Sequence, residues 1–454
     1  MADGLGGDAH HLHVQTGKRK VRGGAKVAYC GAGLQMTIKN LPEVPVENLI
    51  GGCPHLALAR ARREAPLARI STPFTGGEVL MVSRNKNVLR VADDAEHFVS
   101  SGHVQARRFG SGYSKESDLI YENEGWPLRP ALVWTDGEQH ARVRRLVDKV
   151  FTPVKVNRRI SLIQGFIAEL LAEFPAEGQV EYASAYSFRL PTMIITHELG
   201  LGQEHLPLVK RATDTVSFAN DLASPREAAV PAAKAVTELQ RVLAERIVVF
   251  RENPSENLLS DLVHAKLDDT LVLSPDELMS TAILLLLAGS HTTSVMLTWA
   301  LFMLASRQDI QTRLRSDRGR ISNFVEELLR VHGTVSAGYR LAAADTEVAG
   351  STVPKGTCVM IRWDSANRDE SVFERPDEFD IDRPNLWRHT AFGHGKHYCI
   401  GNGLARAELR ETVGAMLDRF NRIDLVDAPS TILPAGALDN HALTRLNLDL
   451  RTAS

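Results

Sequence analysis

The residues Ala391-Phe-Gly-His-Gly-Lys-His-Tyr-Cys-Ile-Gly401 form the segment around which this chain is built. They hold one cysteine, Cys399, among glycines. Gly393 and Gly395 can adopt positive φ angles, and with Gly401 they let the main chain approach a flat ligand closely. The sequence has a helical pattern from Asn402 onward. Cys399 therefore lies just before a helix N-terminus, where free N–H groups and the helix dipole are expected to lower the pKa of a thiol. A thiolate in such a loop is the soft, electron-donating ligand that haem iron takes from cysteine.

This arrangement resembles that of a known family. The pattern Phe392-Gly393-x-Gly395-x-His397-x-Cys399-x-Gly401 is similar to the haem-binding signature of the cytochrome P-450 monooxygenases of the soluble, bacterial type. The resemblance implies that Cys399 ligates the haem iron and that Phe392, Gly393, His397 and Gly401 surround the cofactor. It extends over roughly residues 41 to 450, because further motifs follow in the family's order.

Two other interpretations of the segment are open on the residues alone. His389, His394, His397 and Cys399 are residue types that bind metals and form a candidate zinc site. Their spacing matches no closed zinc pattern, however, and a zinc site gives the glycines no purpose. The cysteine can also be an inert, buried residue of a structural loop. The further motifs favour the haem interpretation.

Composition describes a soluble globular chain of 454 residues, 44% hydrophobic and 24% charged, with a net charge of −2. The near-neutral balance argues against nucleic-acid binding as a main role. The four cysteines are widely spaced and do not form a disulfide framework, so we expect a reducing, cytoplasmic setting. We expect a disordered tail over residues 1–28, without the apolar stretch of a signal peptide or anchor helix, followed by one domain over residues 29–454.

A second motif supplies basic side chains for an acidic ligand. His140 and Arg144 lie four residues apart, hence on one face of an expected helix, where they can grip a carboxylate. A solvated basic face is the ordinary alternative. In the family that the chain resembles, this pair contacts the haem propionates, and Arg340 and His389 match two further propionate contacts.

The longest helix is predicted from Pro275 to Ala305, about 45 Å at 1.5 Å per residue. It begins at a strong signal, Ser274-Pro-Asp-Glu277, which offers a Ser N-cap, Pro at the first position and Glu to complete a capping box. Its hydropathy alone is typical of a membrane span. The polar centre Gly289-Ser-His-Thr-Thr-Ser294 instead indicates the buried spine of a large domain.

The centre of this helix resembles the family's oxygen-activation motif. The resemblance implies that Ala288 and Gly289 open room over the haem and that Thr292 is the threonine that handles protons. His291 departs from the family pattern, which has Asp or Glu there. Because the unperturbed pKa of histidine is about 6.5, His291 can take up and pass protons near neutral pH. It can equally be a structural residue that faces another polar group in the core.

A third charged motif is structural. Glu327 and Arg330 are spaced to form an ion pair along one helix, although such pairs are common. Arg383 follows at the distance expected from the family, and the resemblance implies that it joins the pair in a buried triad.

Together these features predict a mainly α fold with a smaller β region, the single-domain cytochrome P-450 fold around a buried haem b. The predicted function is a haem-thiolate monooxygenase that inserts one oxygen atom from O2 into a small organic substrate. Two alternatives are a haem-thiolate peroxygenase, because His291 replaces the usual acid, and a non-catalytic haem-binding sensor.

The predicted enzyme, expected as a monomer, needs an external source of electrons. The chain has no dinucleotide fingerprint and no flavin domain, so a ferredoxin or flavodoxin with an NAD(P)H-dependent reductase is implied. A basic docking face for an acidic partner is expected from Arg142, Arg145, Lys149, Lys396, Arg406 and Arg410.

The substrate pocket is expected from residues 102–130, 284–288, 333–338 and 433–438, with a lid over residues 216–230. Arg107, Arg108 and Arg129 are candidates to bind a substrate carboxylate, and surface positions are their ordinary alternative. The segment Trp126–Pro130 resembles that of family members acting on small aromatic acids, so an aromatic acid is one candidate substrate.

Overall fold

The computed structural model of the chain describes residues 41–45, 47–50, 54–72, 77–101, 115–219, 226–268, 270–432 and 442–452. The expected tail over residues 1–28 lies outside these residues. So do Arg107, Arg108 and the pocket segment 433–438, together with parts of the expected loop and lid.

Helices make up most of the described chain, in agreement with the predicted fold class. The predicted long helix is α14 (Pro275–Ser306), and the helix predicted after the cysteine is α18 (Asn402–Arg419). The others are α2 (Glu47–Ile50), α3 (His55–Glu64), α4 (Asn85–Asp93), α6 (Lys115–Glu124), α7 (Gly137–Asp148), α8 (Pro153–Arg158), α9 (Ile160–Ala172), α10 (Leu190–Glu198), α11 (Leu206–Ala219), α12 (Ala229–Glu252), α13 (Leu258–Val263), α15 (Gln308–Ser316), α16 (Ile321–His332) and α17 (Trp363–Ala366).

The β region is centred on a five-stranded sheet of order β1-β2-β8-β5-β3. Its strands are β1 (Leu67–Thr72), β2 (Gly77–Val82), β3 (Phe98–Val99), β5 (Ala337–Ala342) and β8 (Cys358–Arg362). Only β2 and β8 pair in parallel, and β5 pairs with β8 so that Arg340 lies opposite Val359. Smaller sheets are formed by β4 (Gly178–Glu181), β12 (Asn447–Arg451) and β9 (Arg422–Leu425), by β6 (Thr346–Val348) and β7 (Ser351–Val353), and by β10 (Ser430–Ile432) and β11 (Ala442–Arg445).

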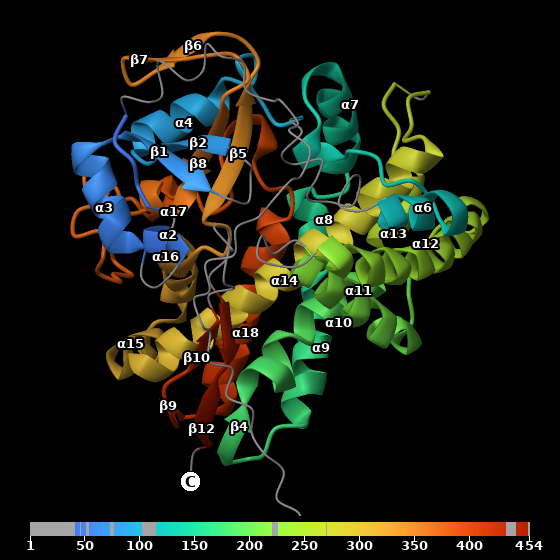
Figure 1. The fold of residues 1–454 in the computed structure, drawn as a ribbon. Coiled ribbons are helices and arrows are strands. Elements are labelled where there is room, and N and C mark those ends of the chain that lie inside the picture. The colour runs from blue at the N-terminus through green and yellow to red at the C-terminus, as the bar shows by residue number, and fades with distance from the viewer. Residues whose placement is uncertain are drawn as a thin grey trace, which may run out of the picture.

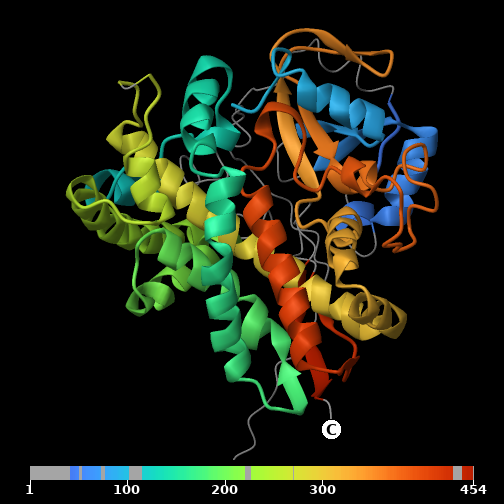
Figure 2. The same ribbon diagram turned by 180° about the vertical axis from the view of Figure 1, so that it is seen from behind.

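Two long helices lie between the sheet and the bulk of the helices. The five-stranded sheet with α3 and α4 occupies one side of the molecule, α9 to α13 the other, and α14 and α18 run between them (Figures 1 and 2). Leu297, Leu301 and Leu304 of α14 are fully buried in the same cluster as Val413 and Leu417 of α18. Burial of each such side chain contributes about 1.5–3 kcal/mol, so this contact supports the centre of the fold.

The start and the polar centre of α14 are as predicted. The Ser274 hydroxyl accepts from the Glu277 N–H at 3.3 Å, and the Glu277 carboxylate accepts from the Ser274 N–H at 2.9 Å, which completes the capping box. The helix is long and apolar enough to cross a membrane, but 72% of its most apolar window is buried inside the protein. Ser290 and Ser294 satisfy their hydroxyls on neighbouring groups, Ser290 with Thr192 of α10 at 3.0 Å. The helix is therefore a core element.

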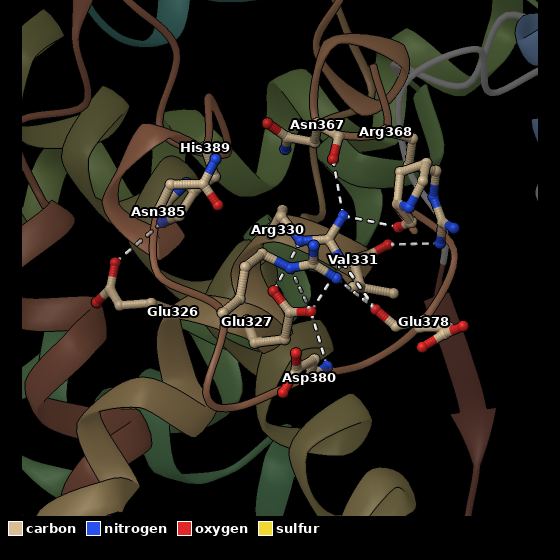
Figure 3. Close-up of polar contacts among 12 residues, drawn as sticks. Glu326, Glu327, Arg330, Val331, Asn367, Arg368, Glu378, Asp380, Asn385 and His389 are labelled. Carbon is tan, nitrogen blue, oxygen red and sulfur yellow. Dashed lines mark hydrogen bonds and ion pairs between the residues drawn. The ribbon is translucent and has the colours of Figure 1, made fainter. Parts of the chain in front are cut away.

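The predicted buried triad forms between α16 and the segment that precedes the cysteine loop. Glu327 accepts from Arg330 Nε at 2.7 Å (Figure 3). It also accepts from Arg383 Nε at 3.2 Å. Arg330 also donates to the carbonyls of Asn367 and Pro376, both at 2.8 Å. All three charged side chains are at most 4% exposed. The triad thus fastens α16 to the residues that lead into Cys399.

Substitution of Glu327 should destabilise the fold strongly. Glu327→Gln leaves two buried guanidinium groups without their carboxylate, and removal of one partner of a buried ion pair typically costs about 3–5 kcal/mol. The free energy of unfolding from urea titration measures the loss. Arg318→Gln is the control, because it breaks the exposed pair with Asp418 and should cost less than about 1 kcal/mol. Similar losses in the two variants would contradict the role given to the triad.

Candidate functional site

The cysteine loop is held by main-chain hydrogen bonds and two left-handed glycines. The Cys399 N–H donates to the Phe392 carbonyl at 2.9 Å, which folds the segment back on itself. Gly393 and Gly395 have φ angles of +73° and +72°, as the sequence predicts. A Cβ atom on Gly395 would also lie 2.7 Å from the Ala92 carbonyl oxygen, so the close approach of α4 requires glycine here.

The pKa of Cys399 differs from the prediction. Burial raises the pKa of the thiol and outweighs the groups that favour the thiolate. Those groups include the predicted N–H donors, Gly401 and Asn402, and the guanidinium groups of Arg144 and Arg406. The prediction of a lowered pKa was therefore wrong, because the sequence does not reveal how deeply the sulfur lies.

Across the core, the middle of α14 borders open space at the turn where the sequence predicts part of the substrate pocket. Ala288 is exposed although the helix is buried from Leu278 to Leu286, so open space lies beside this turn. The Thr292 hydroxyl donates to the Ala288 carbonyl at 2.7 Å and keeps its own lone pairs available as acceptors. A side chain at Gly289 would meet only Ile195, at 3.9 Å, so the geometry gives no steric reason for that glycine.

His291 lies on the same turn and is largely enclosed. Burial lowers its pKa below the ordinary value, and the carboxylate of Asp214 in α11 acts in the opposite direction. Asp214 is 61% exposed and pairs with Lys210 one turn earlier in α11. The charged group that acts on His291 is thus an acid on a neighbouring helix.

A cluster of basic side chains gathers between α7, β5 and the cysteine loop. The rings of His140 and His397 lie 4.3 Å apart, and His397 Nε2 lies 3.3 Å from the carboxylate of Asp136. The other ring nitrogen of His397 is buried and has no hydrogen-bond partner among the described residues. Arg340 is buried as well and donates to the Tyr339 carbonyl.

The electrostatics of this cluster favour an anionic ligand. Burial lowers the pKa of His140 to about 4, with His397 and Arg144 adding to the effect, and it lowers the pKa of Arg340 to about 10. The pKa of Asp136 stays well below its usual range despite burial, because His397 and the Ser101 N–H bond to its carboxylate. Asp136 alone does not satisfy all the buried donors of this cluster. The two propionate carboxylates of haem would fit the remaining donors.

Two of the predicted propionate residues have other partners. Arg144 donates to the Tyr398 carbonyl at 2.6 Å and to Asp148 at 2.9 Å, which ties α7 to the cysteine loop. His389 uses both ring nitrogens: Nδ1 accepts from the Ala391 N–H and Nε2 donates to Glu326 at 2.9 Å (Figure 3). The structure therefore brings together His140, Arg340 and His397, with His389 outside the cluster.

The residues of the zinc interpretation are separated in the same way. His394 contacts Asp93, whereas His397 and His389 contact Asp136 and Glu326. Within the part of the chain that the structure describes, no group of three or more histidine, cysteine or acidic side chains is placed to hold a metal ion. The geometry gives the zinc interpretation no support.

The predicted basic face is smaller than expected. Arg142 is paired with Glu277 of the capping box, and Arg406 with Glu326, so neither presents a free charge. Arg145, Lys149, Lys396 and Arg410 are exposed. Arg129, a candidate for substrate binding, lies 3.5 Å from Asp276 and is 60% exposed, in keeping with a surface role.

Sequence reasoning missed two acids of the site, Asp136 and Glu326. Asp136 immediately precedes α7 and contacts the cysteine loop through His397. Glu326 stands next to the predicted Glu327. A carboxylate four residues before His140 and a second glutamate beside Glu327 were visible in the sequence, but their partners were not.

Comparison with known proteins points to one family. Residues 224–436 match the family model described as Cytochrome P450. The chain is 34% identical to the cyclomarin C epoxidase CymV of Salinispora arenicola, over 68% of this chain and 81% of that protein. It is 30% identical to the cytochrome P450 monooxygenase PikC of Streptomyces venezuelae, over 84% of this chain and 87% of that protein. The solved structure of cytochrome P450 CYP109Q5 from Chondromyces apiculatus matches with a TM-score of 0.78 and 27% identity, over 91% of this chain and 99% of that chain.

The basic cluster generates a prediction about haem retention. Loss of a hydrogen bond to a charged group costs about 1.5–3 kcal/mol, so haem should leave Arg340→Ala at least about tenfold faster than the wild type. Transfer of haem to an acceptor apoprotein measures the rate. Arg129→Ala removes an arginine outside the cluster and should behave as wild type. Equal rates in Arg340→Ala and the wild type would exclude Arg340 as a haem contact.

Proposed function

Because this chain belongs to the cytochrome P450 family, and is thus a monooxygenase that holds haem b, we propose that Cys399 is the thiolate ligand of the haem iron. His140, Arg340 and His397 would hold the propionates, with Arg144 supporting the loop from α7. The cysteine loop, shaped by Phe392, Gly393 and Gly401, would lie against the haem ring. On the other side of the haem would lie Ala288 and Gly289.

The observation that carries this proposal is the geometry of the cysteine loop. The sulfur lies at the start of α18 with the N–H groups of Gly401 and Asn402 acting on it. Leu287, next to Ala288 on α14, and Ile400, next to Cys399, pack against the same hydrophobic cluster. The cysteine loop also supplies His397 to the basic cluster. When bound, haem with a thiolate ligand activates O2, so that one oxygen atom enters an organic substrate and the other leaves as water.

Thr292 and His291 are proposed to manage the protons of this reaction. The Thr292 hydroxyl is fixed by its bond to the Ala288 carbonyl, which leaves its oxygen able to accept a hydrogen bond. His291 precedes it on α14 and is proposed to take up a proton and pass it toward Thr292. The use of peroxide in place of O2 is the second candidate, since a buried, neutral His291 lacks the fixed negative charge of the usual acid.

The electron donor is proposed to be a ferredoxin or flavodoxin with an NAD(P)H-dependent reductase, in the cytoplasm. The basic side chains that remain exposed to an acidic partner are those of Arg145, Lys149, Lys396 and Arg410. The substrate is proposed to be a small organic molecule. The position of Arg129 beside Asp276 gives no support to an aromatic acid.

Substitution of the cysteine tests the proposed ligation. In Cys399→Ala, the reduced, carbon monoxide-bound protein should lose the long-wavelength absorption band that thiolate ligation produces. Cys358→Ala removes the other cysteine of the described residues, on β8, and should keep the band. Persistence of the band in Cys399→Ala would show that another residue ligates the iron.

Substitution of His291 tests the proton relay. His291→Ala should lower the product formed per NAD(P)H consumed and divert electrons to peroxide, whereas His291→Asp and His291→Glu should keep much of the coupling. Because burial lowers the pKa of His291, wild-type coupling should change at an ionisation below about pH 6.5 that His291→Ala lacks. Unchanged coupling in His291→Ala, with lower thermal stability, would mean that His291 is structural.

A further inference from the structure

Two adjacent glutamates on α16 serve different parts of the molecule. Consecutive residues of an α-helix point about 100° apart, because the helix has 3.6 residues per turn. Glu327 turns into the core and pairs with Arg330 and Arg383, whereas Glu326 turns toward the cysteine loop (Figure 3). The triad accounts for Glu327 and leaves Glu326 to be explained.

Glu326 is the acceptor for two side chains from the cysteine region. Its carboxylate accepts from Arg406 Nε at 2.7 Å and Nη2 at 2.9 Å, and from His389 Nε2 at 2.9 Å. Burial opposes its ionisation, but the bonds from His389 and Arg406 lower the pKa of Glu326 to about 2. The Nδ1 of His389 accepts the Ala391 N–H, which leaves Nε2 to donate to Glu326. Arg406, whose guanidinium is always charged, is the cation that Glu326 holds through two bonds.

Arg406 contacts two residues, Phe392 and Asn402, that hydrogen-bond to the two peptide groups of Cys399. Its guanidinium lies 4.5 Å from the centre of the Phe392 ring, and the Phe392 carbonyl accepts the Cys399 N–H at 2.9 Å. Its Nη1 donates to the Asn402 side chain at 2.8 Å, and Asn402 donates to the Cys399 carbonyl at 2.7 Å. The position of Arg406 therefore influences the position of Cys399 through these two residues.

The charge of Arg406 acts on the sulfur as well. Arg144 and Arg406 are guanidinium groups whose charges both stabilise negative charge on the sulfur. Arg144 has an exposed counter-charge, Asp148, which is 52% exposed and strongly screened by water. Glu326 is 22% exposed, so water screens its negative charge less than that of Asp148. Its charge therefore offsets that of Arg406 more strongly.

We propose that Glu326 is a positioning residue for Cys399: it fixes Arg406 and cancels its charge, so that the thiolate keeps its electron density for the haem iron. This inference rests on the proposed ligation of haem by Cys399. Loss of the carboxylate would leave an uncompensated positive charge near the sulfur. Positive charge favours the reduced, more negative state of the haem–thiolate centre, so the reduction potential should rise.

The test measures the midpoint reduction potential of the haem-loaded protein, which does not depend on turnover. Glu326→Gln keeps the size of the side chain and removes its charge, and it should raise the potential while the long-wavelength carbon monoxide band is retained. Glu411→Gln is the matched control on α18: this carboxylate accepts from Gln164 and contacts neither Arg406 nor the cysteine loop through a hydrogen bond. It should leave the potential unchanged.

The double variant Glu326→Gln/Arg406→Gln separates charge from packing. Both charges are then absent, so the potential should return toward the wild-type value even though two more contacts are lost. A merely structural Glu326 predicts the reverse, with the double variant at least as far from wild type as the single one. If Glu326→Gln loses its haem during purification, better retention by the double variant supports the inference and equal or poorer retention overturns it.

Failure of this inference can be told from failure of the proposed function. An unchanged potential in Glu326→Gln, with wild-type protein showing the thiolate band, overturns the role of Glu326 alone. Persistence of the band in Cys399→Ala overturns the ligation, and the inference falls with it.

Discussion

The negative charge that Cys399 would carry as the proposed haem ligand is the constraint on which the rest of the site depends. Burial of the sulfur opposes that charge, whereas the N–H groups of Gly401 and Asn402 and the charges of Arg144 and Arg406 favour it. Each of these cations has its own acid, Asp148 or Glu326. Two cations therefore act on the sulfur, and each is paired with an acid. In the role proposed for Glu326, its carboxylate limits how far Arg406 can draw electron density from the thiolate.

The same constraint explains why the fold and the site cannot be separated. α16 carries Glu327, which holds the approach to the cysteine loop, and Glu326, which holds the loop's far side through Arg406. Because both acids belong to one helix, α16 contacts the chain both before and after the cysteine loop. The buried triad is a structural feature by its contacts, but it also sets the frame in which Arg406 meets Phe392.

Signals carried by neighbouring residues made much of this architecture predictable. The capping box of α14, the left-handed glycines and the Glu327–Arg330 pair each depend on residues within a few positions of one another, and all three are present as predicted. Partners from distant segments were not predictable. Arg406 lies 80 residues from Glu326, and nothing in the sequence around Arg142 indicates that Glu277 would pair with it. The pKa of Cys399 was mispredicted for the same reason, since burial is a property of the whole fold.

On α14, the residue at position 291 differs in charge from the family pattern. The family pattern has an acid where α14 carries His291, and here the acid that acts on it is Asp214 of α11. Asp214 is largely exposed and paired with Lys210, so solvent and Lys210 weaken its field at His291. Burial prevails and His291 is neutral near pH 7, which leaves this wall of the pocket without a fixed negative charge. Under the proposed relay, a proton then reaches Thr292 only after His291 has taken it up against the cost of burial. Under the proposed relay, proton supply is therefore the step at which this chain would differ from the family pattern.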